Sequence, residues 1–100
     1  MSQAGKPGRD STERTTLRHR RVPMRALGEE LIVARPRDGA PVVLAPTAAF
    51  VWHQLDGWIT PGEIDRRTAD AFPEVAEEDR VKARREILGM LTDDDLIERD

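Results

Sequence analysis

The sequence contains no cysteine and only two histidines among its 100 residues. Without cysteine, a disulfide framework and a thiolate metal site are both excluded, and a reducing compartment is the natural expectation. His19 and His53 are the only imidazoles and do not supply the usual metal ligand sets. Neither a Ser-His-Asp spacing nor a glycine-rich phosphate loop occurs. The chain is therefore predicted to be no enzyme and to use no metal or cofactor.

Long apolar runs are also missing. No stretch approaches the roughly 18 apolar residues that a membrane-spanning helix requires, and the first residues contain no apolar segment typical of a signal peptide. The expectation is a soluble, cytoplasmic protein with no membrane partner. At 100 residues with 38% hydrophobic content, the chain has room for one modest core and therefore for one domain.

Charge is distributed unevenly along the chain. Residues 1–21 hold six basic and two acidic side chains, a local charge of +4, so the remaining residues carry −7. This segment is polar and almost without aliphatic side chains, which predicts a disordered basic N-terminal tail over residues 1–21 and a folded domain over residues 22–100. Its arginines could contact nucleic acid or an acidic partner, although a solvated arm is the plainer interpretation.

Three short apolar-rich runs follow the tail: "VPMRAL", "ELIVAR" and "APVVLA". They are separated by Gly28-Glu29 and by "PRDG", whose Asp38-Gly39 is a turn signal. This pattern predicts a three-stranded antiparallel β-meander. The third run must then lie at a sheet edge, where backbone amide and carbonyl groups have no partner. Pro41 removes one of those donors near the start of the run.

A first helix is expected directly after the meander. Pro46 suits the first helical position, where a missing amide hydrogen costs nothing. The apolar residues that follow recur at helical spacing, and Gly57 is expected to end the helix. Trp52 is expected in the core, and so is Trp58, for which an exposed contact with a partner enzyme is the alternative.

Two further helices complete the predicted fold. Thr60, Pro61 and Glu63 form a capping-box pattern that opens the second helix. The third helix is expected from about Glu77 to about Met90, with a frayed end at the acidic run 93–95, where Asp nevertheless tolerates a left-handed turn. Leu96 and Ile97 are expected to fold back onto the core. The predicted fold class is α+β: a winged-helix-like domain with a three-stranded antiparallel β-meander followed by three α-helices.

The order of these motifs carries a resemblance to a known family. The stretches "VVLAPTAAFVWHQLDGWITPGEI" and "ILGMLTDDDLI" resemble the PqqD-like family of peptide chaperones, which are recognition elements for the precursors of ribosomally synthesised, modified peptides (RiPPs). The resemblance covers roughly residues 22–98. The matching positions are Leu44, Thr47-Ala48, Val51-Trp52, Leu55-Asp56-Gly57, then Thr60, Glu63 and Ile64, and finally Leu88, Leu91, Leu96 and Ile97.

The resemblance implies a non-catalytic peptide chaperone of natural-product biosynthesis. Such a protein binds the leader segment of a precursor peptide by strand addition to its third strand, and delivers it to a modifying enzyme such as a radical SAM protein, a cyclodehydratase or a leader peptidase. The side chains of alternate leader residues would enter a groove between that strand and the third helix. The expected leader-binding residues are Pro41, Val42, Val43, Leu44 and Ala45 on the strand, and Val81, Arg84, Arg85 and Leu88 on the helix.

The third helix also carries the densest basic cluster outside the tail, made of Arg80, Lys82, Arg84 and Arg85. One hypothesis is that some of these side chains attract acidic leader residues. The alternative is that they form ion pairs with Glu77 or Glu78 on the helix surface, each contributing only about 0.3–0.5 kcal/mol.

Two functions from other classes stay open. Three helices with a sheet also describe a winged-helix DNA-binding regulator, whose recognition helix would be the third helix. The charge of −7 outside the tail, with Glu77, Glu78, Asp79 and Glu86 on that helix, counts against nucleic acid as a partner. The other alternative is a scaffold that binds an enzyme without any peptide. A homodimer formed through the free strand edge is also open.

Overall fold

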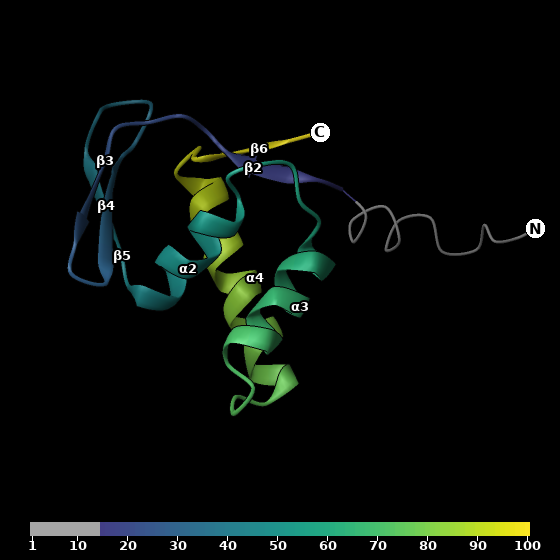
Figure 1. The fold of residues 1–100 in the computed structure, drawn as a ribbon. Coiled ribbons are helices and arrows are strands. Elements are labelled where there is room, and N and C mark those ends of the chain that lie inside the picture. The colour runs from purple at the N-terminus through teal and green to yellow at the C-terminus, as the bar shows by residue number, and fades with distance from the viewer. Residues whose placement is uncertain (1–14) are drawn as a thin grey trace, which may run out of the picture.

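A computed structural model describes residues 15–100 of the chain. A three-stranded antiparallel sheet leads into three helices, and a small two-stranded ribbon joins the two ends of the described segment (Figure 1). The α+β class and the meander followed by three helices are thus confirmed. The sheet has the strand order β3-β4-β5, with bounds β3 (Met24–Leu27), β4 (Glu30–Ala34) and β5 (Pro41–Leu44).

The sheet has one buried and one exposed face because side chains alternate along each strand. Leu31 faces Leu44 across β4 and β5, and Val33 faces Val42 on the same side. Leu31, Val33 and Leu44 are buried in the core beneath the sheet. The opposite face carries the row that includes Val43, which is exposed.

The three helices are α2 (Pro46–Gln54), α3 (Pro61–Ala71) and α4 (Glu77–Asp93). Pro46 occupies the first helical position as expected, but α2 ends at Gln54, before Gly57. The predicted cap of α3 is confirmed, because the Glu63 amide donates to Thr60 Oγ1 at 3.1 Å. In α2 the N-cap is Ala45, and no side chain caps that helix.

The C-terminal end of α4 is closed rather than frayed. The Asp95 amide donates to the Thr92 carbonyl at 3.0 Å and the Leu96 amide to the Leu91 carbonyl at 2.8 Å, the two hydrogen bonds of a Schellman motif. Asp95 has φ of 59°, the left-handed conformation that this motif requires. Leu91 and Leu96 are fully buried, so a hydrophobic contact replaces the expected fraying and confirms the fold-back of Leu96.

The predicted boundary of the N-terminal tail is wrong for its last part. Leu17–His19 forms β2, which pairs antiparallel with β6 (Ile97–Arg99). Leu17 is 1% exposed and also bridges to Ile59, with two backbone hydrogen bonds of 2.8 and 2.9 Å. Short-range patterning missed β2 because its partner lies about eighty residues away. Residues 1–14 of the predicted tail lie outside the described residues.

The two tryptophans differ in burial. Trp52 is 0% exposed at the centre of the core, as expected. Trp58 is 46% exposed, so its predicted burial is wrong, and the Arg18 guanidinium carbon lies 4.5 Å from its ring centroid. Gly57 and Trp58 follow the end of α2, where the chain runs over the surface. Within residues 15–100, no helix is long and apolar enough to cross a membrane.

Candidate functional site

The free edge of β5 is the first element of the candidate site. Within residues 15–100, β5 is the last strand of the β3-β4-β5 sheet, and only one of its edges is paired. The Arg35 amide donates to the Ala40 carbonyl at 2.8 Å, which makes 35 and 40 a hydrogen-bonded pair. Bonded pairs alternate along an antiparallel ladder, so Val42 and Leu44 bond to β4 while Pro41 and Val43 direct their backbone groups outward.

This alternation defines the groups that the β5 edge offers to another strand. Val43 presents both its amide and its carbonyl. Pro41 presents only a carbonyl, because proline has no amide hydrogen. Ala45 presents an amide, while its carbonyl already accepts from the Ala49 amide at 2.8 Å. The edge therefore has two donors and two acceptors for an added strand.

The predicted strand residues differ in what their side chains can do. Val43 is 56% exposed on the outer face, and Pro41 and Ala45 are also exposed. Val42 is half-buried and packs against the core, and Leu44 is 0% exposed. Leu44 therefore belongs to the core, and its contribution to the edge is limited to anchoring the strand.

The C-terminal end of α4 is tied to the turn that precedes β5. Arg35 Nη1 donates to Asp94 Oδ1 at 3.2 Å, and Arg37 Nη2 lies 3.6 Å from the same oxygen. Arg35 also makes a two-pronged contact with Asp38, at 3.0 and 2.9 Å. These contacts hold the start of β5 beside the end of α4.

The Arg35 guanidinium also changes the charge behaviour of this turn. Its hydrogen bonds to Asp38, with a further bond from the Ala40 amide, lower the pKa of the Asp38 carboxyl to about 2. The pKa of Arg35 is raised, mainly by its hydrogen bond to Asp38 and then by that to Asp94. Both groups are therefore charged at neutral pH, and the turn keeps its shape by ion pairing.

The start of α2, directly after β5, packs near α4. An apolar cavity of about 180 Å³ lies where the start of α2 meets the end of α3 and the first half of α4. Thr47, two residues after the Ala45 edge amide, shares this cavity with Ala83 of α4. The cavity is lined by Thr47, Thr68, Phe72, Val75, Asp79, Arg80, Ala83 and Arg84.

Ile87 and Met90 lie on α4 between Ala83, which lines the cavity, and Asp94, which binds Arg35. The spacings from Ala83 to Ile87, Met90 and Asp94 are four, three and four residues, so all four side chains share one side of the helix. Ala83 lines the cavity beside Thr47 and Asp94 binds Arg35, so this side of α4 is tied to the two segments that flank β5. Ile87 and Met90 are half-buried and pack against the core. These two side chains are the candidate apolar helix wall of the site.

The predicted helix wall was placed on a different side of α4. Arg84 is 8% exposed, and its Nε and Nη2 donate to the two carboxylate oxygens of Asp65 on α3 at 2.9 and 2.7 Å. Asp65 already holds this guanidinium, so Arg84 fastens α4 to α3. Leu88 is 8% exposed and belongs to the core.

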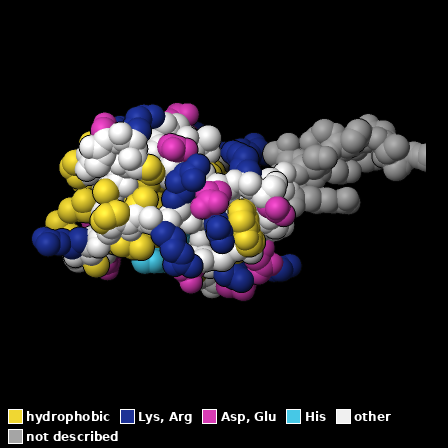
Figure 2. Space-filling view, turned by 90° about the horizontal axis from the view of Figure 1, so that it is seen from above, with side chains coloured by type: hydrophobic (Ala, Val, Ile, Leu, Met, Phe, Trp, Pro, Cys, Tyr) yellow, Lys and Arg dark blue, Asp and Glu magenta, His cyan; other side chains and the backbone are white. Residues whose placement is uncertain are grey.

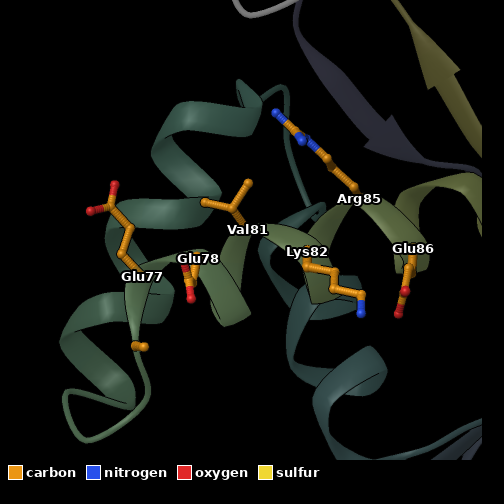
Figure 3. Close-up of a pocket in the computed structure, with 7 residues that line it drawn as sticks. Glu77, Glu78, Val81, Lys82, Arg85 and Glu86 are labelled. Carbon is orange, nitrogen blue, oxygen red and sulfur yellow. The ribbon is translucent and has the colours of Figure 1, made fainter.

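Val81 and Arg85 lie on the outer surface of α4, beside a broad hollow of about 670 Å³. Figure 3 shows them spread along this surface, with Arg85 extending toward the side where β2 and β6 lie. A second hollow joins Arg85 to Leu17 and Arg99 of that ribbon. No residue of β5 lines either hollow, so the structure does not bring Val81 and Arg85 together with the β5 edge.

Sequence reasoning chose this side of α4 because two adjacent apolar stripes overlap on the helix. Leu88 and Leu91 form a buried stripe, whereas Ile87 and Met90 form a half-buried stripe next to it. Periodicity does not distinguish them. The contact that orients the helix is that of Asp94, in register with Ile87 and Met90, with Arg35 in a distant turn, and the local pattern of α4 does not reveal it.

The remaining basic side chains of α4 are spread around the helix, and Arg80 lines the cavity that Thr47 shares with Ala83. Arg80 donates to the backbone carbonyl of Val75, just before the helix. Lys82 and Arg85 lie among Glu78 and Glu86 on the outer surface (Figure 3). In residues 15–100, no group of three His, Asp or Glu side chains is placed to hold a metal ion.

Comparison with known protein families, with curated proteins and with solved structures returns no match.

Proposed function

We propose that this chain binds an extended peptide as an added strand on the free edge of β5. The observation that carries the proposal is that the outer edge of β5 has no partner strand within residues 15–100. The half-buried side chains of Ile87 and Met90 supply the candidate apolar wall. Backbone hydrogen bonds to Val43 would hold the peptide, and the helix wall would contact the side chains on its inner face. The function is recognition, and no catalytic step is assigned to the chain.

The peptide of the proposal is the leader segment of a ribosomally synthesised precursor, as in the PqqD-like family that the sequence resembles. The chain would present that precursor to a modifying enzyme. The β5 edge supports this role because it is only four residues long, which suits a single strand better than a whole sheet. Charge also favours a peptide over nucleic acid, since the chain outside residues 1–21 carries −7.

The decisive variant is Val43→Pro. The Val43 amide faces away from β4, so proline removes an edge donor without removing a ladder hydrogen bond. We expect the dissociation constant for leader segments of short precursors encoded beside the gene to rise by about tenfold or more. Val43→Thr is the matched control because it keeps the amide and the β-branched shape. Binding is followed in the amide spectrum of the ¹⁵N-labelled chain.

The spectrum also locates the contact. Shifts at residues 41–45 together with Ile87 and Met90 are the expected result. Shifts confined to Val81 and Arg85, or equal affinity for the Val43→Pro variant, would contradict strand addition at β5. Binding of duplex DNA at low salt without any response to peptide would instead support the regulator alternative.

A further inference from the structure

The sheet has a second unpaired edge, on β3. β3 is the other end strand of the β3-β4-β5 order, and within residues 15–100 nothing pairs with its outer side. All four of its residues are exposed, including Met24 at 47% and Leu27 at 57%. Figure 1 places β3 on the side of the sheet away from the helices, and Figure 2 shows hydrophobic side chains gathered on that side of the molecule.

The exposure of β3 has a cause in the packing of the helices. α2 packs against β4 and β5, so the core lies beneath those two strands. Met24 faces Val33 and Ala26 faces Leu31 on the core side of the sheet, yet Met24 and Ala26 are exposed while Val33 and Leu31 are buried. The apolar face of the sheet thus extends one strand beyond its helical cover.

The backbone of β3 offers a complete set of hydrogen-bonding groups. The Ala34 amide donates to the Pro23 carbonyl at 3.0 Å, which makes 23 and 34 a bonded pair. By alternation Arg25 and Leu27 also bond to β4, while Met24 and Ala26 direct their amides and carbonyls outward. Unlike the β5 edge, this edge has no proline at an outward position.

Charge along this segment changes sign from one end to the other. Arg20 and Arg21 precede β3, and Glu29 and Glu30 follow it at the hairpin. An antiparallel copy of the same segment would place its acidic end against the basic end of the first. The β3 edge is therefore complementary to itself in charge as well as in hydrogen bonding.

We propose that β3 is a self-association edge, at which two copies of this chain pair their β3 strands antiparallel and form one six-stranded sheet. With Met24 opposite Ala26 of the second copy, all eight outward backbone groups of the two strands are used, in four hydrogen bonds. Arg21 then faces Glu29 of the second copy. At the two-fold axis of the dimer, Arg25 faces Arg25 of the second copy, and this like-charge contact weakens the dimer.

This proposal is independent of the proposed function. The dimer uses the edge opposite β5, so it leaves both β5 edges open at the far ends of the joined sheet. A dimer of this kind would carry two equivalent sites. Loss of the dimer and loss of peptide binding are therefore produced by different variants.

The test is sedimentation of the full chain over a wide range of concentrations. A concentration-dependent dimer is expected, and Ala26→Pro should abolish it, because the Ala26 amide faces outward and its loss spares the ladder with β4. Val43→Pro is the matched control at the other edge and should leave the dimer unchanged. Met24→Lys is expected to abolish the dimer as Ala26→Pro does, and it does so without altering the backbone.

Arg25→Thr tests the register. Removing the like charges at the two-fold axis should tighten the dimer several-fold, since a β-branched neutral pair is favourable at that position. A chain that stays monomeric at every concentration would overturn the proposal. So would a dimer that survives both Ala26→Pro and Met24→Lys, or one that Val43→Pro abolishes. A dimer that Arg25→Thr weakens would contradict the register.

Discussion

The imidazole of His19 lies flat on the indole of Trp52, with ring centroids 4.2 Å apart and planes within 1° of parallel. His19 is 7% exposed and Trp52 is fully buried. His19 Nδ1 donates to the Arg20 carbonyl at 2.9 Å, which fixes the orientation of the ring. This stack fastens β2 to the centre of the helical core.

Replacing His19 with Ala should lower the free energy of unfolding by about 2–3 kcal/mol, because it removes a stacked ring and leaves a cavity above Trp52. Urea unfolding followed by tryptophan fluorescence measures the change. Arg18→Ala is the control on the same strand, since its half-exposed side chain contacts Trp58 at the surface and should cost much less. Equal losses for the two variants would argue against a structural role for the stack.

Breaking the Arg84–Asp65 pair should be costly, because it leaves a shielded carboxylate without its partner. We expect Arg84→Ala to cost about 2–4 kcal/mol of stability, reduced from the range for fully buried pairs because Asp65 retains some exposure. Arg85→Ala, one residue along on the outer surface, is the matched control and should change stability by less than about 0.5 kcal/mol.

A double-variant cycle separates the pair from the packing around it. Arg84→Met combined with Asp65→Ala should recover part of the loss seen in either single variant, since no unpaired charge is left between α3 and α4. Additive losses in the double variant would show that the two side chains act separately.

Asp95 is the one non-glycine residue in the described part of the chain with positive φ. Asp95→Gly should therefore be more stable than Asp95→Ala by about 1 kcal/mol, since only glycine adopts the left-handed conformation without steric cost. Both variants lose the contact between the Asp95 carboxylate and Arg20, so their difference isolates the backbone effect. Thermal unfolding of the two variants side by side gives the comparison, and identical midpoints would contradict it.

The ion-paired turn before β5 should weaken in acid. The pKa of Asp38 is about 2 in the folded chain against an ordinary value of 3.8, so its stabilising effect is complete above about pH 4 and is lost as pH falls through about 2. The stability difference between the wild type and Asp38→Asn should therefore be constant from about pH 5 to 7 and shrink below about pH 4. Urea unfolding at stepped pH measures it. A difference that persists at about pH 2 would contradict the assignment.

Local patterns predicted much of this fold because they act over short distances. The meander follows from turn residues between apolar runs, and the Thr60 cap from a three-residue spacing. The β2–β6 ribbon could not be found this way, since each strand has three residues and charged side chains, and they pair across almost the whole chain. Trp58 was misjudged because an aromatic ring can also be held at the surface by a cation.

The candidate site was predictable on its strand side only. An edge strand follows from strand order, so the exposed position of Val43 was foreseeable. The helix wall depends on how α4 is rotated, which is set by two contacts between distant residues: Arg84 with Asp65, and Asp94 with Arg35. No periodicity in α4 reveals which of its carboxylates and guanidiniums find partners elsewhere.

The missing amide hydrogen of Pro41 has a kinetic consequence. With only four backbone groups on the β5 edge, a ladder built there is short, and it can unzip from the Pro41 end, where one rung is incomplete. A peptide strand added there as proposed should dissociate rapidly, because few hydrogen bonds hold it and differences in affinity between related complexes lie mostly in the off-rate. Rapid exchange would let one copy of the chain bind many peptides in succession. The residence time of each peptide would be set by its side chains that contact Ile87 and Met90.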